Sequence, residues 1–264
     1  MLVGELFEML NVSKNAQNQI HNTLLAMNNI KIALNNAIKP LVFVLPDMVK
    51  TFSQIQEQMI QIQSINEKMR TEGFDGALRV FSFGDVIDLK DTNDFDATMY
   101  QKTIDENFIS LILETVKDSE IHSHRYHIIE EAVKLHKSEM FHGSITLSLS
   151  QIEGIINDFL IHHKIASYDV DQNVIIDEKK ITGIKKKLES ILKRDFSDTS
   201  LMNELSNSAY IGGDNKRVGI NDVRNGILHG SNICYGSQKM STQTILWLYA
   251  IVIEAEFIRK ATAN

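Results

Sequence analysis

The sequence has few of the residues that cross-link a chain or interrupt a helix: one cysteine and two prolines among 264 residues. The single cysteine, Cys234, excludes an intramolecular disulfide framework and is typical of proteins kept in a reducing cytosol. Proline breaks helices, and both prolines, Pro40 and Pro46, lie in the first fifth of the chain. The remainder is therefore expected to form long, uninterrupted helices.

Long apolar runs and a secretion leader are also lacking. Two apolar runs, residues 41–45 and 245–253, are far shorter than the roughly 20 residues that a membrane-spanning helix needs. The N-terminus shows no basic region followed by an apolar core and a small-residue cleavage site. The sequence therefore predicts a soluble, cytoplasmic protein that does not enter a membrane.

The sequence lacks a complete set of metal ligands as well. His122, His124 and His127 are close in sequence, but on a helix only His124 and His127 share a face, and no third ligand completes a site. Residues 169–180 begin with the aspartate spacing of a calcium loop, without its essential glycine and its final glutamate. We expect the three histidines on a solvated helix surface, and we expect neither a metal nor a cofactor.

The net charge of −7 is unusual for a protein that binds nucleic acid, because phosphate contacts require basic side chains. The basic residues are unevenly distributed, however, and residues 179–194 carry seven lysines or arginines against one glutamate. The weak candidates for RNA contacts in this segment are Lys185, Lys186, Lys187, Lys193 and Arg194. A solvated, lysine-rich helix explains the segment equally well.

Apolar residues recur every three or four positions along much of the chain, a pattern typical of helices. The chain divides into an N-terminal helical hairpin module (1–70), a linker (71–98) and a helical domain (99–264). In the module, helices are expected over residues 1–38 and from Asp47, the predicted N-cap, onward. Glycines interrupt the linker, and its residues 80–83 are a candidate short strand. The predicted fold is all-α.

The helical domain is expected to form a bundle. Its predicted helices cover residues 98–117, 119–138 (capped by Ser119), 141–162, 182–194 and 221–230, with a last helix capped by Ser241 or Thr242 and a β-hairpin or loop at 168–180. The last helix is apolar nearly all round from 245 to 253, so we expect it to be buried, in the core or at a subunit interface.

Residues 221–230 carry the polar side chains that we select as a candidate site. On a helix, Ile220, Val223 and Ile227 fall on one apolar side, and Asn225 and His229 fall together on a polar arc with Arg224 at its edge. A guanidinium, an amide and an imidazole then converge on a space that suits one phosphodiester. Such pairs of arginine and histidine also occur on ordinary solvated helices.

The Arg224-Asn225 pair followed after three residues by His229 resembles the signature of the HEPN superfamily of all-helical domains, many of which are metal-independent ribonucleases. Gly230 and the run 231–235 resemble bacterial members found in abortive-infection and other phage-defence systems. Residues 125–160, particularly the Gln-Ile-Glu-Gly run at 151–154, resemble the helix pair that precedes the signature. The resemblance covers roughly residues 100–260. It implies an endoribonuclease that acts as a toxin or effector in anti-phage defence.

The predicted chemistry is attack of a ribose 2′-OH on its own phosphate, which leaves a 2′,3′-cyclic phosphate and a 5′-OH. His229 exchanges protons near neutral pH, and Arg224 stabilises the charge that develops on the phosphoryl oxygens. Asn225 positions His229 or the phosphate. The resemblance implies that an acidic residue of the 141–162 helix lies near the signature, so Glu153 is the candidate that orients Arg224 or His229. A polar seam on a solvated helix is the alternative for Glu153.

The predicted partners are RNA and a second copy of the chain, in a homodimer with a composite active site. The two-fold axis would supply a second histidine for the second proton transfer. A neutralising or sensor protein is a further partner that the resemblance allows. The alternatives are a non-catalytic helical module that binds RNA or a protein, and an oligomeric scaffold built on the N-terminal helices.

Overall fold

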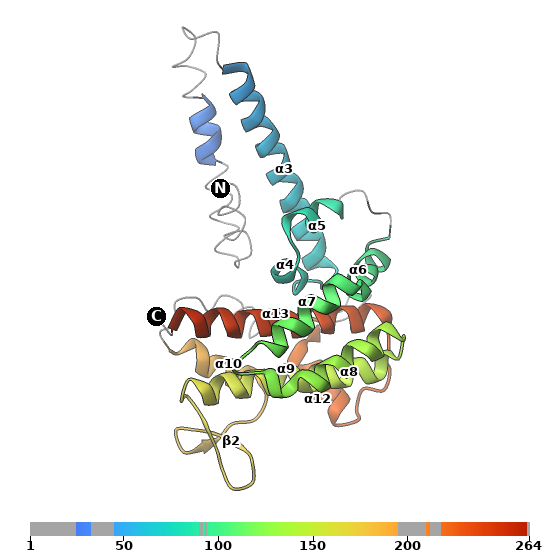
Figure 1. The fold of residues 1–264 in the computed structure, drawn as a ribbon, viewed down its shortest axis with the longest axis vertical. Helices are drawn as coiled ribbons and strands as arrows, with labels where there is room; N and C mark the ends of the chain where they lie inside the picture. Colours follow the sequence, from blue (N-terminus) through green and yellow to red (C-terminus); the bar gives the residue numbers. More distant parts are fainter. Residues whose placement is uncertain are drawn as a thin grey trace. The chain divides into compact units, whose positions relative to one another are not determined.

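The computed structural model describes residues 25–32, 45–89, 92, 94–194, 210–211 and 218–262. The chain forms two compact units, one of Met1–Lys68 with Phe81–Asp91 and one of Met69–Val80 with Thr92–Asn264. Helices make up most of the described residues, and the strands are two or three residues long (Figure 1). The all-α prediction is therefore confirmed. No helix in this described part of the chain is long and apolar enough to cross a membrane.

The first unit contains α5 (Phe83–Asp88) and most of α3 (Leu45–Thr71), and residues 25–32 are helical. The other residues of the helix predicted over 1–38 lie outside the described ones. The second predicted helix is confirmed, but α3 begins two residues before Asp47, with Pro46 in its first turn, where a missing N–H costs nothing. Asp47 is therefore inside the helix rather than its N-cap.

The segment expected as a linker is folded into helices. Val80 is the last residue of α4 (Ala77–Val80) and Phe83 is the first of α5, so the predicted strand at 80–83 is wrong. Within the second unit, Phe74 and Ala77 are fully buried. A Cβ on Gly76 would lie 2.9 Å from the backbone nitrogen of Trp247. This close approach fixes residues 69–80 against the last helix of the domain.

Two long helices, α9 (Phe141–His162) and α13 (Gln238–Thr262), lie side by side at the centre of the second unit (Figure 1). The predicted bounds of α9 are confirmed. Its predicted apolar stripe is fully buried, at Ile145, Leu149, Ile152, Ile156 and Phe159. Apolar side chains spaced at three and four residues thus form the surface on which the other helices pack.

The last helix, α13, begins three residues before the predicted Ser241. The hydroxyl of Ser237 accepts a hydrogen bond from the N–H of Met240 at 3.2 Å, so Ser237 acts as the cap, and Ser241 and Thr242 are buried within the helix. The predicted burial of its apolar segment is confirmed. Because α9, α4 and α6 cover α13 within this chain, its apolar segment 245–253 lies in the core, the first of the two expected locations.

The helix predicted over 98–117 is two helices, α6 (Phe95–Ile104) and α7 (Glu106–Lys117). Asp105 separates them, because its backbone is extended and its carboxylate accepts hydrogen bonds from the N–H groups of Asn107 and Phe108. The next predicted helix begins later than Ser119, as a 3-10 turn η2 (Ser123–Arg125) followed by α8 (Tyr126–Lys137).

The remaining elements position the candidate site. They are an antiparallel sheet of β1 (Ser167–Tyr168), β2 (Val174–Ile176) and β3 (Lys179–Lys180), the helix α10 (Ile184–Leu192), the antiparallel pair β4 (Tyr210–Ile211) and β5 (Val218–Gly219), and the helix α12 (Ile220–Leu228). Of the β-hairpin or loop predicted at 168–180, the structure shows the antiparallel hairpin. Both α10 and α12 pack on α9, so the lysine-rich helix and the signature helix share one support.

Candidate active site

The signature helix α12 ends where its sequence provides a left-handed glycine. Gly230 has a φ of 72°, and its N–H donates to the carbonyl of Ile227 at 3.0 Å. The chain then turns back, and the N–H of Asn232 donates to the carbonyl of Gly226 at 2.8 Å. His229 is therefore the C-cap, one residue beyond the helix, and its side chain is exposed.

Arg224, Asn225 and His229 line one pocket of about 340 Å³. The other lining residues are Thr182, Gly183, Lys185, Lys186 and Asn221. The three signature side chains thus share a concave space with two lysines of α10, so cationic, amide and imidazole groups surround the same volume.

Asn221 joins the signature helix to the start of α10. Its side-chain oxygen accepts a hydrogen bond from the N–H of Ile184 at 3.2 Å. Gly183, the N-cap of α10, has a φ of 82°, and a Cβ there would lie 3.4 Å from the same oxygen. The N-terminal end of α10, which carries a partial positive charge, is consequently part of the pocket wall.

Arg224 is anchored on two sides. One terminal nitrogen donates to the side-chain oxygen of Asn225 at 3.0 Å, and the other forms an ion pair with Glu153 of α9. Its side chain is 18% exposed, and its Nε is buried without a hydrogen-bond partner among the described residues. Asn225 thus orients the guanidinium. Glu153 was expected to orient Arg224 or His229, and it pairs with Arg224.

Glu153 has a second cationic partner that the sequence did not predict. The Nζ of Lys187 lies 2.6 Å from the other carboxylate oxygen of Glu153, and the Lys187 side chain is only 5% exposed. Lys187 is therefore not a surface lysine available to RNA, unlike Lys185 and Lys186. A signal for this existed, because the buried positions of α10 are Ile184, Lys187, Leu188 and Ile191, one helical face.

The other two basic candidates are less closely connected with the site. Lys193 and Arg194 are exposed just beyond α10, and neither lines the pocket. Of the five candidates in the basic segment, the structure brings two, Lys185 and Lys186, to the three signature residues.

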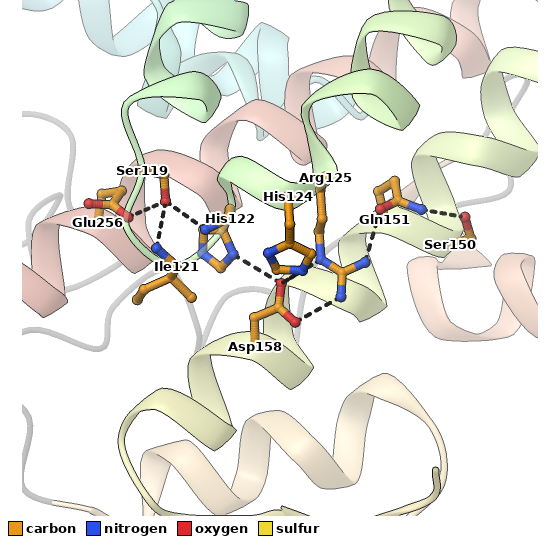
Figure 2. A network of polar contacts seen from close by, with 9 residues as sticks. All are labelled: Ser119, Ile121, His122, His124, Arg125, Ser150, Gln151, Asp158 and Glu256. Atoms are coloured by element: carbon orange, nitrogen blue, oxygen red, sulfur yellow. Dashed lines mark hydrogen bonds and ion pairs between the residues drawn. The ribbon is translucent and has the colours of Figure 1, made fainter.

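A second charged network occupies the next part of α9, around Asp158 (Figure 2). Arg125 donates from Nε and one terminal nitrogen to the two Asp158 oxygens, at 2.5 and 2.8 Å, and from the other terminal nitrogen to Gln151 at 3.0 Å. A Cβ on Gly154 would overlap this guanidinium, so a larger residue there would displace Arg125 from these contacts. Within the Gln-Ile-Glu-Gly run, Gln151 thus accepts a hydrogen bond from Arg125, and Gly154 leaves room for its guanidinium.

Two of the three neighbouring histidines also belong to this network. His122 is fully buried and its Nδ1 lies 3.4 Å from Asp158, whereas His124 is exposed and lies 3.3 Å from the same oxygen. The expectation of a solvated helix surface is therefore wrong for His122. Burial acts to raise the pKa of Asp158, but the hydrogen bonds from Arg125 and His122 outweigh it and hold this pKa below its ordinary value.

Within the described parts of the chain, no group of three or more His, Cys, Asp or Glu side chains is arranged to hold a metal ion. Comparisons with protein-family models, curated proteins and solved structures gave no match.

Proposed function

We propose that the protein is a metal-independent endoribonuclease of the HEPN type, with its active site in the Arg224 pocket. The observation that carries the proposal is the convergence of Arg224, Asn225 and His229 on one pocket with Lys185 and Lys186 on its wall. A phosphodiester matches this set, because it is anionic and its cleavage requires proton transfer beside the phosphate.

In the proposed reaction, the ribose 2′-OH attacks the adjacent phosphate and the bond to the 5′-oxygen breaks. His229 takes the proton of the 2′-OH or gives one to the leaving oxygen, and its exposure lets it reach either atom. Arg224 stabilises the negative charge that builds on the phosphoryl oxygens. The products are a 2′,3′-cyclic phosphate and a 5′-OH, so DNA is not a substrate.

A complete reaction uses one group to remove a proton and another to supply one. We propose that the active form is a homodimer in which two copies of the pocket meet across a two-fold axis, so that His229 is present twice. The suggested biology is that of a toxin or effector in anti-phage defence, with a neutralising or sensor protein as a further partner. This part of the proposal rests on the resemblance of residues 125–160 and 224–235.

The decisive experiment incubates the purified full chain with total RNA in the presence of EDTA. We expect cleavage, cyclic-phosphate ends and no action on DNA, and we expect His229→Ala to abolish the activity. His127→Ala is the matched control, since His127 is an exposed histidine outside the pocket. Strict dependence on Mg²⁺ or Mn²⁺ would contradict the mechanism, and RNA binding without cleavage would identify a binding module instead.

A further inference from the structure

Glu153 joins two cations that come from different helices. Its carboxylate lies between Lys187 of α10 and Arg224 of α12, and it is itself on α9. The exposed fractions are 5% for the Lys187 side chain, 13% for Glu153 and 18% for Arg224. The chain of charges thus runs from a buried lysine to an arginine that lines the pocket.

The formal charges of this group determine what the pocket presents to an anion. Glu153 and Arg224 alone would be neutral as a pair, so a phosphate would meet little net attraction from Arg224. Lys187, which does not line the pocket, adds a positive charge at the other carboxylate oxygen of Glu153, and the three groups then sum to one positive charge. Electrostatic interactions are strong at partly buried sites, so this difference affects anion binding directly.

We propose that Lys187 is a positioning residue that neutralises Glu153, so that Glu153 orients Arg224 without cancelling its charge toward a phosphate group. The inference rests on the proposed function, because it assigns a phosphate to the Arg224 pocket. The inference also explains why only one of three consecutive lysines is buried. Lys185 and Lys186 line the pocket, whereas Lys187 pairs with Glu153, the carboxylate that binds Arg224.

The test uses substitutions that change charge with little change of shape. Lys187→Met removes the buried positive charge, Glu153→Gln removes the negative charge, and the double variant removes both. The net charge of the group becomes zero, two and one, respectively, against one in the natural protein. The probe is inorganic phosphate, measured by calorimetric titration of the full chain and as a competitive inhibitor of RNA cleavage.

We expect phosphate affinity to decrease in the order Glu153→Gln, natural protein and double variant together, Lys187→Met. Each step should be about tenfold, the order expected for one unit charge near a partly buried site. In cleavage assays, Lys187→Met should lower kcat, and adding Glu153→Gln should recover part of the loss. Lys186→Met is the matched control, because it removes a neighbouring charge at the pocket wall and leaves Glu153 paired. Its kcat should stay nearly unchanged, so the loss of kcat that Glu153→Gln partly recovers should be specific to Lys187→Met.

A purely structural role for Lys187 predicts a different result, with every variant weaker than the natural protein and no recovery in the double variant. That result overturns the inference. If Lys187→Met alone does not fold, the double variant carries the test, since replacing both buried charges by uncharged groups of similar size is tolerated far better than leaving one unpaired. Its phosphate affinity should equal that of the natural protein, whereas a structural role predicts weaker binding. Phosphate binding is measured whether or not RNA is cleaved, so a failure of the proposed function is distinguished from a failure of this inference.

Discussion

Two carboxylates on α9, five residues apart, each hold an arginine, and their surroundings differ. Asp158 binds Arg125 through two hydrogen bonds, and Gln151 takes the remaining terminal nitrogen. Glu153 binds Arg224 through one terminal nitrogen, and the Arg224 Nε has no partner among the described residues. Each nitrogen of the first arginine has a hydrogen bond within the protein, whereas the second arginine is bonded less completely and lines a pocket.

The contrast shows how the same pair of residue types serves two purposes. A pair in which every guanidinium nitrogen has a hydrogen bond joins η2 to α9, beside a glycine that leaves room for the arginine, and serves structure. An incompletely bonded pair at a pocket wall, backed by a second cation, is suited to an incoming anion. We therefore expect substitutions in the Asp158 network to affect stability and substitutions in the Glu153 group to affect the proposed cleavage.

The largest expected effect is on cleavage, at Arg224. Arg224→Met should lower the rate of RNA cleavage by about a thousandfold, the loss typical of removing a donor to a developing oxyanion. Its melting temperature should change little, because Glu153 keeps Lys187 as its partner. Arg224→Lys should recover only part of the rate, since an ammonium lacks the planar fork of a guanidinium. A large fall in melting temperature would mean that Arg224 is structural, like Arg125.

The second effect is on stability, at Arg125. Arg125→Met should lower the free energy of unfolding by about 3 to 4 kcal/mol, because it leaves the largely buried Asp158 without its main partner. Adding Asp158→Asn should recover much of this loss, which urea denaturation can measure. Cleavage per folded molecule should stay unchanged. A selective loss of activity in a stable Arg125→Met variant would contradict the division between the two networks.

The sequence predicted those parts of this arrangement that depend on local pattern. The apolar stripe of α9 has one helical period from Ile145 to Phe159, and its predicted bounds are those observed. Helical spacing correctly placed Arg224, Asn225 and His229 on one side of the chain. Although His229 lies one residue beyond α12, it keeps the helical position because its N–H still donates to the carbonyl of Asn225.

The features that the sequence failed to predict depend on which partner a side chain contacts in the fold. The periodicity of residues 95–117 continues through Asp105, and only the capping bonds of its carboxylate show the break. Three consecutive lysines look alike in sequence, and the rotation of α10 on α9 decides that Lys187 alone turns inward. Arg125 is held by both Gln151 and Asp158 of α9, and a contact between residues so far apart in sequence is not contained in any local pattern.

The third effect is the loss of stability in acid. The pH at which it occurs distinguishes the Asp158 network from another buried group, His136. His136 is fully enclosed between Thr103 and Ser241, and burial lowers its pKa to about 4. The unfolded chain then binds a proton that the folded chain does not, so stability should fall by about 3 kcal/mol as the pH drops from about 6.5 to about 4. His136→Gln should flatten this part of the curve of unfolding free energy against pH.

Asp158 acts at lower pH with the same proton balance, because the unfolded chain again binds a proton that the folded chain does not. Its folded-state pKa is depressed, so its contribution is complete above the ordinary carboxyl range and is lost as the pH falls through the lowered pKa. Asp158→Asn should therefore remove a fall in stability that lies below the His136 step. If both variants altered the same pH range, the two networks would titrate as one.

The smallest effect is expected at the pocket wall, where Lys185 and Lys186 lie beside the signature residues. Replacing both by alanine should raise KM about tenfold and leave kcat nearly unchanged, because exposed lysines attract the RNA backbone equally before and during the reaction. The dependence of affinity on salt should weaken by about two phosphate contacts, as measured by RNA binding at several ionic strengths.

Lys193→Ala with Arg194→Ala is the matched control, since these side chains are exposed but do not line the pocket. An equal loss in the control would mean that RNA follows the general charge of residues 179–194 rather than a path into the Arg224 pocket. A loss of kcat at Lys185 and Lys186 would instead place them in the same charged group as Arg224.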